Sequence, residues 1–119
     1  MTFVKYLLCG VQNYDWGVKG SSSLVAKLKL GNDHSFTIDE ELPYAELWMG
    51  AHPKLESVVI TENGQINLSK FLNINGKRSL PYMMKVLSIN EALSIQVHPD
   101  LETAKKLHAH APAEYPDSN

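Results

Sequence analysis

The chain has 119 residues, which is room for one domain at most. A hydrophobic fraction of 44% and a charged fraction of 20% are those of a globular protein and exclude a disordered or fibrous chain. The net charge of −2, without a run of like charges, gives no sign of a nucleic-acid-binding surface. The single cysteine, Cys9, excludes an internal disulfide and is typical of a reducing, cytoplasmic compartment.

The first third of the chain predicts a strand, a loop and a helix. Residues 3–11 read as a strand, whose apolar run is too short to span a membrane and precedes no signal-peptide cleavage site. A serine within 21–23 is expected to cap a short helix that reaches about residue 30, with Gly31 as its stop. Residues 31–42 are polar and acidic, as in a surface loop.

The remaining elements are mostly strands. Two short β-prone runs flank Asn63-Gly64, which predicts a hairpin over 57–68. We expect a short helix near 69–72, then a loop over 73–80 with a turn at Asn75-Gly76. Two strands, 82–89 and 93–98, and a helix over about 101–110 capped by Asp100 complete the order. This order favours an all-β or β-rich α+β fold, a barrel or sandwich with short flanking helices.

The segment 93–98 alternates apolar and polar side chains with the period of a β-strand. The apolar face is expected to form core: Leu93, Ile95 and Val97. The other face carries a hydroxyl, an amide and an imidazole: Ser94, Gln96 and His98. Side chains two apart on a strand can share a metal ion, but Gln is a rare zinc ligand. By spacing alone, a solvated strand edge remains the commoner interpretation.

Residues 44–53 hold a carboxylate inside an apolar segment. If this segment is a strand, Tyr44, Glu46 and Trp48 share one face. Glu46 then lies either in water or in a pocket, where it could act as a general acid or base. His52, directly before a proline, is more typical of a turn than of a ligand site.

Two further side chains leave alternatives open. Lys85 sits in an otherwise apolar strand, so its ammonium either reaches water at a sheet edge or faces an anion in a cavity. Trp16 is either a core plug or a flat wall against a ligand.

Five sequence blocks occur in a characteristic order: residues 12–17 (QNYDWG), 44–53 (YAELWMGAHP), 85–88 (KVLS), 93–100 (LSIQVHPD) and 115–117 (YPD). Together they closely resemble the amino-terminal part of type I mannose-6-phosphate isomerases, also called phosphomannose isomerases. The resemblance covers essentially the whole chain, and five ordered blocks are far more specific than one short motif.

The resemblance implies a cupin-type, jelly-roll-like β-barrel and a zinc-dependent enzyme. Such enzymes interconvert mannose 6-phosphate and fructose 6-phosphate, which supplies GDP-mannose for glycosylation. The implied reaction opens the sugar ring and moves a proton between C1 and C2 through an enediol, while zinc polarises the oxygens on those carbons. The implied partner is therefore a small sugar phosphate, without nucleic acid or membrane, and a monomer is favoured for the parent protein.

By the same matching, Gln96 and His98 are implied zinc ligands. The family's active-site cavity is implied to be lined by Trp16, Glu46, Lys85 and Ser94. Glu46, Lys85 and Ser94 are the implied catalytic groups, and Trp16, Lys85 and Ser94 the implied substrate contacts. An ammonium and a hydroxyl suit an anionic, polyhydroxy substrate.

This chain differs from members of the family in its length. Family members continue past the block at 115–117 into a His-Lys-Pro-Glu segment whose Glu is a third zinc ligand, and further on into a His ligand and an Arg near the substrate. Because catalytic zinc normally takes about three protein ligands, two from one strand should bind weakly. We therefore expect residues 1–119 to be the amino-terminal portion of the catalytic domain, with an incomplete barrel.

Two alternatives remain at this point. One is a non-catalytic product, either a truncated chain or a cupin fragment kept for binding or regulation. The other is an unrelated metal-dependent cupin such as an oxygenase, but those use His-rich ligand sets, and Gln96 beside a single His98 argues against redox iron chemistry.

Overall fold

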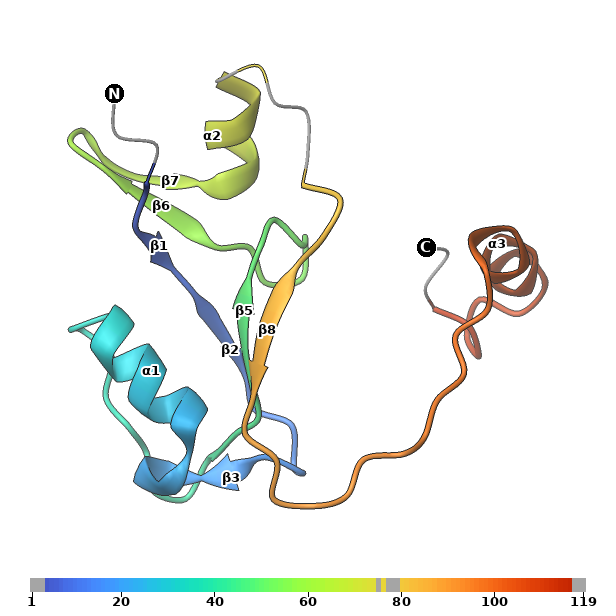
Figure 1. Ribbon diagram of the computed structural model, residues 1–119, viewed down its shortest axis with the longest axis horizontal. Helices are drawn as coiled ribbons and strands as arrows, with labels where there is room; N and C mark the ends of the chain where they lie inside the picture. Colours follow the sequence, from blue (N-terminus) through green and yellow to red (C-terminus); the bar gives the residue numbers. More distant parts are fainter. Residues whose placement is uncertain (1–3, 75, 77–79, 117–119) are drawn as a thin grey trace.

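The computed structural model describes residues 4–74, 76 and 80–116 (Figure 1). Within this part of the chain the strands form three small antiparallel sheets and close no barrel. The strand order in the first sheet is β1 (Leu7–Leu8), β6 (Val58–Thr61) and β7 (Gly64–Asn67). The order in the second sheet is β2 (Gly10–Gln12), β5 (Glu46–Met49) and β8 (Met84–Leu87). The third sheet pairs β3 (Val18–Lys19) with β4 (Pro43–Tyr44). The helical segments are η1 (Gly20–Ser22), α1 (Leu24–Asn32), α2 (Leu68–Ile74) and α3 (Leu101–His110). The expected β-rich fold with short helices and an incomplete barrel is confirmed.

The expected first strand is broken at Cys9 into β1 and β2, and its residue 3 lies outside the described residues. The break is held by the side chain of Asn32, at the end of α1. Its amide nitrogen donates to the carbonyl of Leu7 at 2.6 Å, and its oxygen accepts from the Cys9 N–H at 2.8 Å. A side chain thus takes the place of a strand partner, and the chain passes from the first sheet to the second.

The serine cap of α1 is confirmed and the predicted stop is wrong. Ser23, which is fully buried, accepts from the Ala26 N–H at 3.2 Å and donates to the Tyr44 carbonyl at 2.9 Å. The helix runs through Gly31 to Asn32, because nothing at Gly31 requires a left-handed backbone. Its last turn is closed instead by an ion pair between Lys29 and Asp33 at 2.9 Å.

Helix α1 covers one face of the second sheet and encloses the main core. The buried residues of this core come from the strands, from α1 and from the break between β1 and β2: Cys9, Val25, Ala26, Tyr44 and Leu47. Val11 and Val86, on the strands that flank β5, pack against them. A smaller cluster joins α2 to the first sheet: Val59, Leu68 and Leu72.

The alternation along 44–49 is interrupted at Ala45, which belongs to no strand. Tyr44 therefore packs in the α1 core with Leu47, while Glu46 and Trp48 lie on the opposite face of β5. The prediction that Tyr44 shares the face of Glu46 is wrong, because one irregular residue shifts the period of two.

Gly17 makes this interruption possible. A Cβ on Gly17 would lie 2.7 Å from both the Cα and the backbone nitrogen of Ala45. The residue also forms a β-bridge with Ile89, at the far end of the predicted strand 82–89, of which only Met84–Leu87 is regular. The backbone at Gly17 therefore lies against Ala45 and pairs with Ile89, at a position that has room for glycine only.

The predicted hairpin is confirmed as β6 and β7, with Thr61 opposite Gly64. Gly64 takes a φ of 110°, so the glycine of the Asn-Gly pair supplies the left-handed backbone that the turn requires. Helix α2 follows directly and confirms the expected helix with wider bounds. Asn75, of the predicted turn at 75–76, lies outside the described residues.

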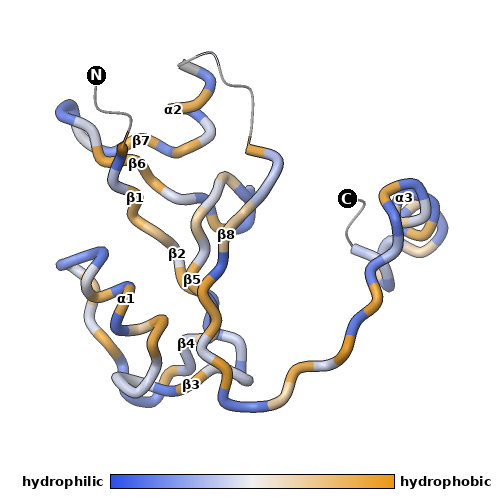
Figure 2. Tube along the Cα trace, viewed as in Figure 1, coloured by the Kyte–Doolittle hydropathy of each residue, from blue (hydrophilic) through white to orange (hydrophobic). Residues whose placement is uncertain are grey.

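The predicted strand at 93–98 is absent. Residues 92–100 have no regular secondary structure and form an arm that leads away from the sheets (Figure 1), along which hydrophobic and polar residues alternate (Figure 2). Ile95 and Val97, expected in the core, are 100% and 94% exposed. No described strand pairs with this arm, and an alternating pattern does not itself supply a partner. The radius of gyration, 16.7 Å, accordingly exceeds the roughly 13 Å of a compact domain of this length.

The arm ends in α3, whose bounds match the expected helix. Asp100 is its N-cap and accepts from the Thr103 N–H at 2.8 Å. This backbone hydrogen bond lowers the pKa of the Asp100 carboxyl below its usual value.

Gly17→Ala should lower the free energy of unfolding by at least about 2 kcal/mol, because its methyl group would overlap the Ala45 backbone. Gly31→Ala is the matched control. It lies in α1 with nothing within 4 Å of a built Cβ, so it should stabilise by about 0.5–1 kcal/mol through helix propensity. Urea unfolding of both variants measures the two changes in the free energy of unfolding. Equal effects would contradict the close approach of Gly17 to the Ala45 backbone.

Val59→Ala should cost about 2 kcal/mol, since Val59 is fully buried. Ile95→Ala, which removes more apolar surface, should change the stability of the 119-residue chain by less than about 0.5 kcal/mol because Ile95 is fully exposed. Thermal or urea unfolding distinguishes the two, and a large loss from Ile95→Ala would mean that the arm folds back onto the core.

Candidate active site

A cavity of about 410 Å³ lies between the open face of the second sheet and the start of the arm. It is lined by Trp16, Glu46, Ala92, Leu93, Ser94 and Gln96. Four of the six side chains implied as metal ligands or cavity residues, from three separate parts of the sequence, therefore meet at one place. The arm side chains remain exposed, so the cavity is open to solvent.

Glu46 projects from the central strand β5 and is only 8% exposed, which decides between its two interpretations in favour of the pocket. Its Oε2 accepts from the indole Nε1–H of Trp48 at 2.6 Å and forms an ion pair with the Lys85 Nζ at 3.0 Å. Both donors thus converge on one carboxylate oxygen, and a buried carboxylate is stabilised when it is paired in this way.

Lys85 lies at a sheet edge and also faces an anion, so each of its two interpretations holds in part. Its strand β8 is at the edge of the second sheet, and its side chain is 38% exposed. Yet the ammonium turns over the sheet face: besides the ion pair with Glu46, Nζ lies 4.5 Å from the centroid of the Trp48 ring. The position follows from the register, which places Lys85 directly opposite Trp48.

Trp16 forms a wall of the cavity rather than a core plug. It is half-buried and stacks on Tyr14, with ring centroids 5.8 Å apart and an interplanar angle of 24°. The Tyr14 hydroxyl accepts from the Lys54 ammonium at 2.9 Å. A flat aromatic surface with a cation at its rim suits a polar ring compound carrying an anionic group.

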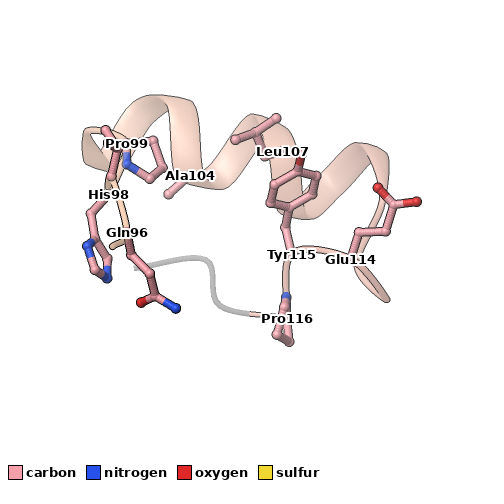
Figure 3. Close-up of a pocket in the computed structure, with 9 residues that line it drawn as sticks. Gln96, His98, Pro99, Ala104, Leu107, Glu114, Tyr115 and Pro116 are labelled. Atoms are coloured by element: carbon pink, nitrogen blue, oxygen red, sulfur yellow. The ribbon is translucent and has the colours of Figure 1, made fainter. Parts of the chain in front are cut away.

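Gln96 and His98 border a second cavity of about 460 Å³ between the arm and α3 (Figure 3). Their side chains lie on the same side of the chain at one end of this cavity, whereas Glu114 lies at the other end. The Gln96 amide nitrogen approaches the Ser94 hydroxyl at 3.4 Å, which leaves the amide oxygen as the atom available to a metal.

The fit to a zinc ion is therefore partial. An amide oxygen and an imidazole nitrogen on one face are acceptable donors, but catalytic zinc takes about three protein ligands. Among the described residues, no three His, Cys, Asp or Glu side chains come together in a way that could hold a metal ion.

His52 is confirmed as a turn residue. Its carbonyl accepts from the Leu55 N–H at 3.0 Å, and its ring nitrogen lies 3.2 Å from the Lys54 backbone nitrogen. Its ring is exposed and meets the Trp48 ring edge-on, with centroids 5.3 Å apart.

Trp48 is the site residue that sequence reasoning missed. The alternation placed it on the face of Glu46 but gave no reason to link the two side chains. The available signal was the Glu-x-Trp spacing itself, since side chains two apart on a strand lie within reach of a hydrogen bond.

Three other findings bear on the sequence expectations. The described part of the chain contains no helix that is both long and apolar enough to cross a bilayer. Cys9 is a free, buried cysteine, and burial raises the pKa of its thiol, so it is a weak nucleophile. The block at 115–117 is described only as far as Pro116, and its Asp117 lies outside the described residues.

Lys85→Gln should lower the free energy of unfolding by about 1–3 kcal/mol, because it leaves the buried Glu46 carboxylate without its counter-ion. Lys106→Gln is the matched control: it breaks the Lys106–Glu102 pair, whose side chains are 73% and 81% exposed, and should cost at most about 0.5 kcal/mol. Comparable losses in urea unfolding would show that Glu46 does not depend on Lys85.

Almost the whole chain is similar to known proteins. The family model of the phosphomannose isomerase type I catalytic domain matches residues 4–119. The mannose-6-phosphate isomerase of Candida albicans is 46% identical over 124 residues, which cover 93% of this chain and 28% of that protein. The enzyme of Mus musculus is 46% identical over 127 residues, covering 95% of this chain and 30% of that protein. The chain thus spans less than a third of the length of these relatives.

Solved structures give the same result. The E134A mutant of phosphomannose isomerase from Salmonella typhimurium superposes with a TM-score of 0.72 at 31% identity, over 97% of this chain and 33% of that one. The Salmonella typhimurium enzyme bound to fructose 6-phosphate and zinc gives a TM-score of 0.68 at 30% identity, over 97% and 32%. The chain carries the part of the cupin fold that these structures share with it, and it belongs to the type I phosphomannose isomerase family.

Proposed function

We propose that this chain is the amino-terminal portion of a zinc-dependent isomerase that interconverts mannose 6-phosphate and fructose 6-phosphate. The observation that carries the proposal is the cavity shared by Trp16, Glu46, Ser94 and Gln96. It lies in a chain whose family includes an enzyme crystallised with fructose 6-phosphate and zinc. The same membership argues against the unrelated oxygenase alternative.

In this proposal Gln96 and His98 are two of the zinc ligands, through the amide oxygen and an imidazole nitrogen. Zinc, when bound, supplies a Lewis acid beside the sugar oxygens. The remaining ligands are proposed to come from sequence outside residues 1–119. Among the described residues, no three His, Cys, Asp or Glu side chains come together in a way that could hold a metal ion. On its own, the 119-residue chain would accordingly bind zinc weakly and be inactive.

The other side chains divide the remaining tasks. The Trp16 face bounds the sugar, and the Ser94 hydroxyl hydrogen-bonds to it from the arm. The Lys85 ammonium attracts the phosphate or a developing oxyanion, although its pairing with Glu46 leaves only part of its charge available. Glu46, at the cavity wall, is the candidate acid or base for the proton that moves between C1 and C2.

The proposed setting follows from the proposed substrate. A sugar phosphate is a small soluble metabolite, so the enzyme would act in the cytoplasm as part of the supply of GDP-mannose. Cys9, free and buried, is compatible with a reducing compartment. A monomer with neither nucleic-acid nor membrane partners is the proposed state.

The first test measures zinc content and isomerase activity for the 119-residue chain beside a form extended to the length of its relatives. We expect stoichiometric zinc and turnover only in the extended form. Zinc at full stoichiometry in the short chain would contradict the ligand assignment and redirect the search to Glu46 and His52.

The second half of the test uses the extended form with His98→Ala and, as control, His110→Ala. His98→Ala should remove most of the bound zinc and nearly all activity. His110 is exposed on α3 and does not border the cavity beside Gln96 and His98, so His110→Ala should retain both. Full zinc occupancy in His98→Ala would show that His98 is not a ligand.

A further inference from the structure

We propose that Trp48 is a positioning residue for the isomerase reaction: its indole N–H fixes the Glu46 carboxylate, and its ring holds the Lys85 ammonium above that carboxylate. The inference rests on the proposed function. It assigns to Trp48, which is outside the implied set of active-site residues, the task of fixing Glu46 at the wall of the cavity together with the lysine that pairs with it.

The first argument is the convergence of donors on one oxygen. The Trp48 N–H lies 2.6 Å from Glu46 Oε2, and the Lys85 Nζ lies 3.0 Å from the same atom. A carboxylate that accepts from a charged and a neutral donor is fixed in its rotation as well as in its position. Glu46 Oε1 is then presented in a defined direction, whereas a carboxylate paired with a flexible lysine alone could rotate.

The second argument is the position of the Lys85 ammonium. A lysine has a long, flexible side chain, and holding it costs rotamer entropy. Here the ammonium lies 4.5 Å from the Trp48 ring centroid and directly across the sheet from it. The ring therefore restricts the lysine to the same small volume in which it meets Glu46.

The third argument is that Trp48 itself is firmly held. It is 4% exposed, lies on the central strand of its sheet, and its carbonyl accepts from the buried Ser57 hydroxyl at 3.3 Å. The His52 ring meets it edge-on, and the Lys54 ammonium lies 5.8 Å from its centroid. A rigid side chain that contacts both members of an ion pair can set their geometry, which is what a positioning residue requires.

One part of the test is made on the 119-residue chain by NMR of the tryptophan indole N–H groups, of which the chain has two. Trp48→Phe assigns the Trp48 signal. Glu46→Gln should then move that signal upfield by more than it moves the Trp16 signal, because the charged acceptor is lost. Glu102→Gln, in the exposed pair on α3, should move neither. A Trp48 signal unaffected by Glu46→Gln would overturn the proposal.

The other part measures kcat and KM for mannose 6-phosphate in the extended form. Trp48→Phe should lower kcat about ten- to a hundredfold with KM changed by less than about threefold, as expected when a reacting group is misplaced rather than lost. The double variant with Glu46→Gln should be slowed by clearly less than the product of the two single effects, because Trp48 acts mainly through Glu46. Independent, multiplying effects of the two substitutions would overturn the proposal.

Tyr44→Phe controls for a merely structural effect. It removes a hydroxyl that accepts from the Asp39 N–H at 2.8 Å in the core on the opposite face of the second sheet. It should lower stability as Trp48→Phe does but leave kcat near the parent value. A parental extended form without isomerase activity would defeat the proposed function, and the role of Trp48 with it. If the parental extended form is active but the effects of Trp48→Phe and Glu46→Gln multiply, only the proposed role of Trp48 is contradicted.

Discussion

The division of the central strand β5 into two faces is the constraint on which the rest of the structure depends. Leu47 faces α1 and the apolar core, while Glu46 and Trp48 face the other way. Strands on both sides of β5 fix this alternation, because a slip of one residue would place the carboxylate in the core. The irregular residue before the strand is tolerated only where Gly17 gives it room.

The chemistry of the site follows from this division. The face of β5 toward α1 contributes stability by burying apolar area. The opposite face can therefore hold charged and aromatic groups close together. The buried carboxylate is stabilised there by an indole and an ammonium, and no buried side-chain nitrogen or oxygen among the described residues lacks a partner. The polar face is thus ordered before any ligand arrives, which is the arrangement that favours catalysis over mere binding.

Local signals located the helices and the hairpin, because Ser23 and Asp100 cap as predicted and Gly64 supplies the turn, but they ended α1 too early at Gly31. The residues grouped around the first cavity were found by resemblance to a family, since no spacing rule links segments eighty residues apart. What failed needed tertiary information. The arm at 93–98 has a strand's periodicity without a described partner, and the link from Trp48 to its neighbours depends on cross-strand register.

The arm has a further consequence for the chain in solution. Its backbone N–H groups from residue 92 to 98 belong to no sheet ladder, so they should exchange with solvent deuterium far faster than those of β5. An exposed backbone without regular secondary structure is also what proteases cleave first, and cutting there would separate Gln96 or His98 from the sheets while leaving the α1 core intact. The two proposed zinc ligands therefore lie on an exposed segment without regular structure, and a segment that pairs with the arm would protect both of them.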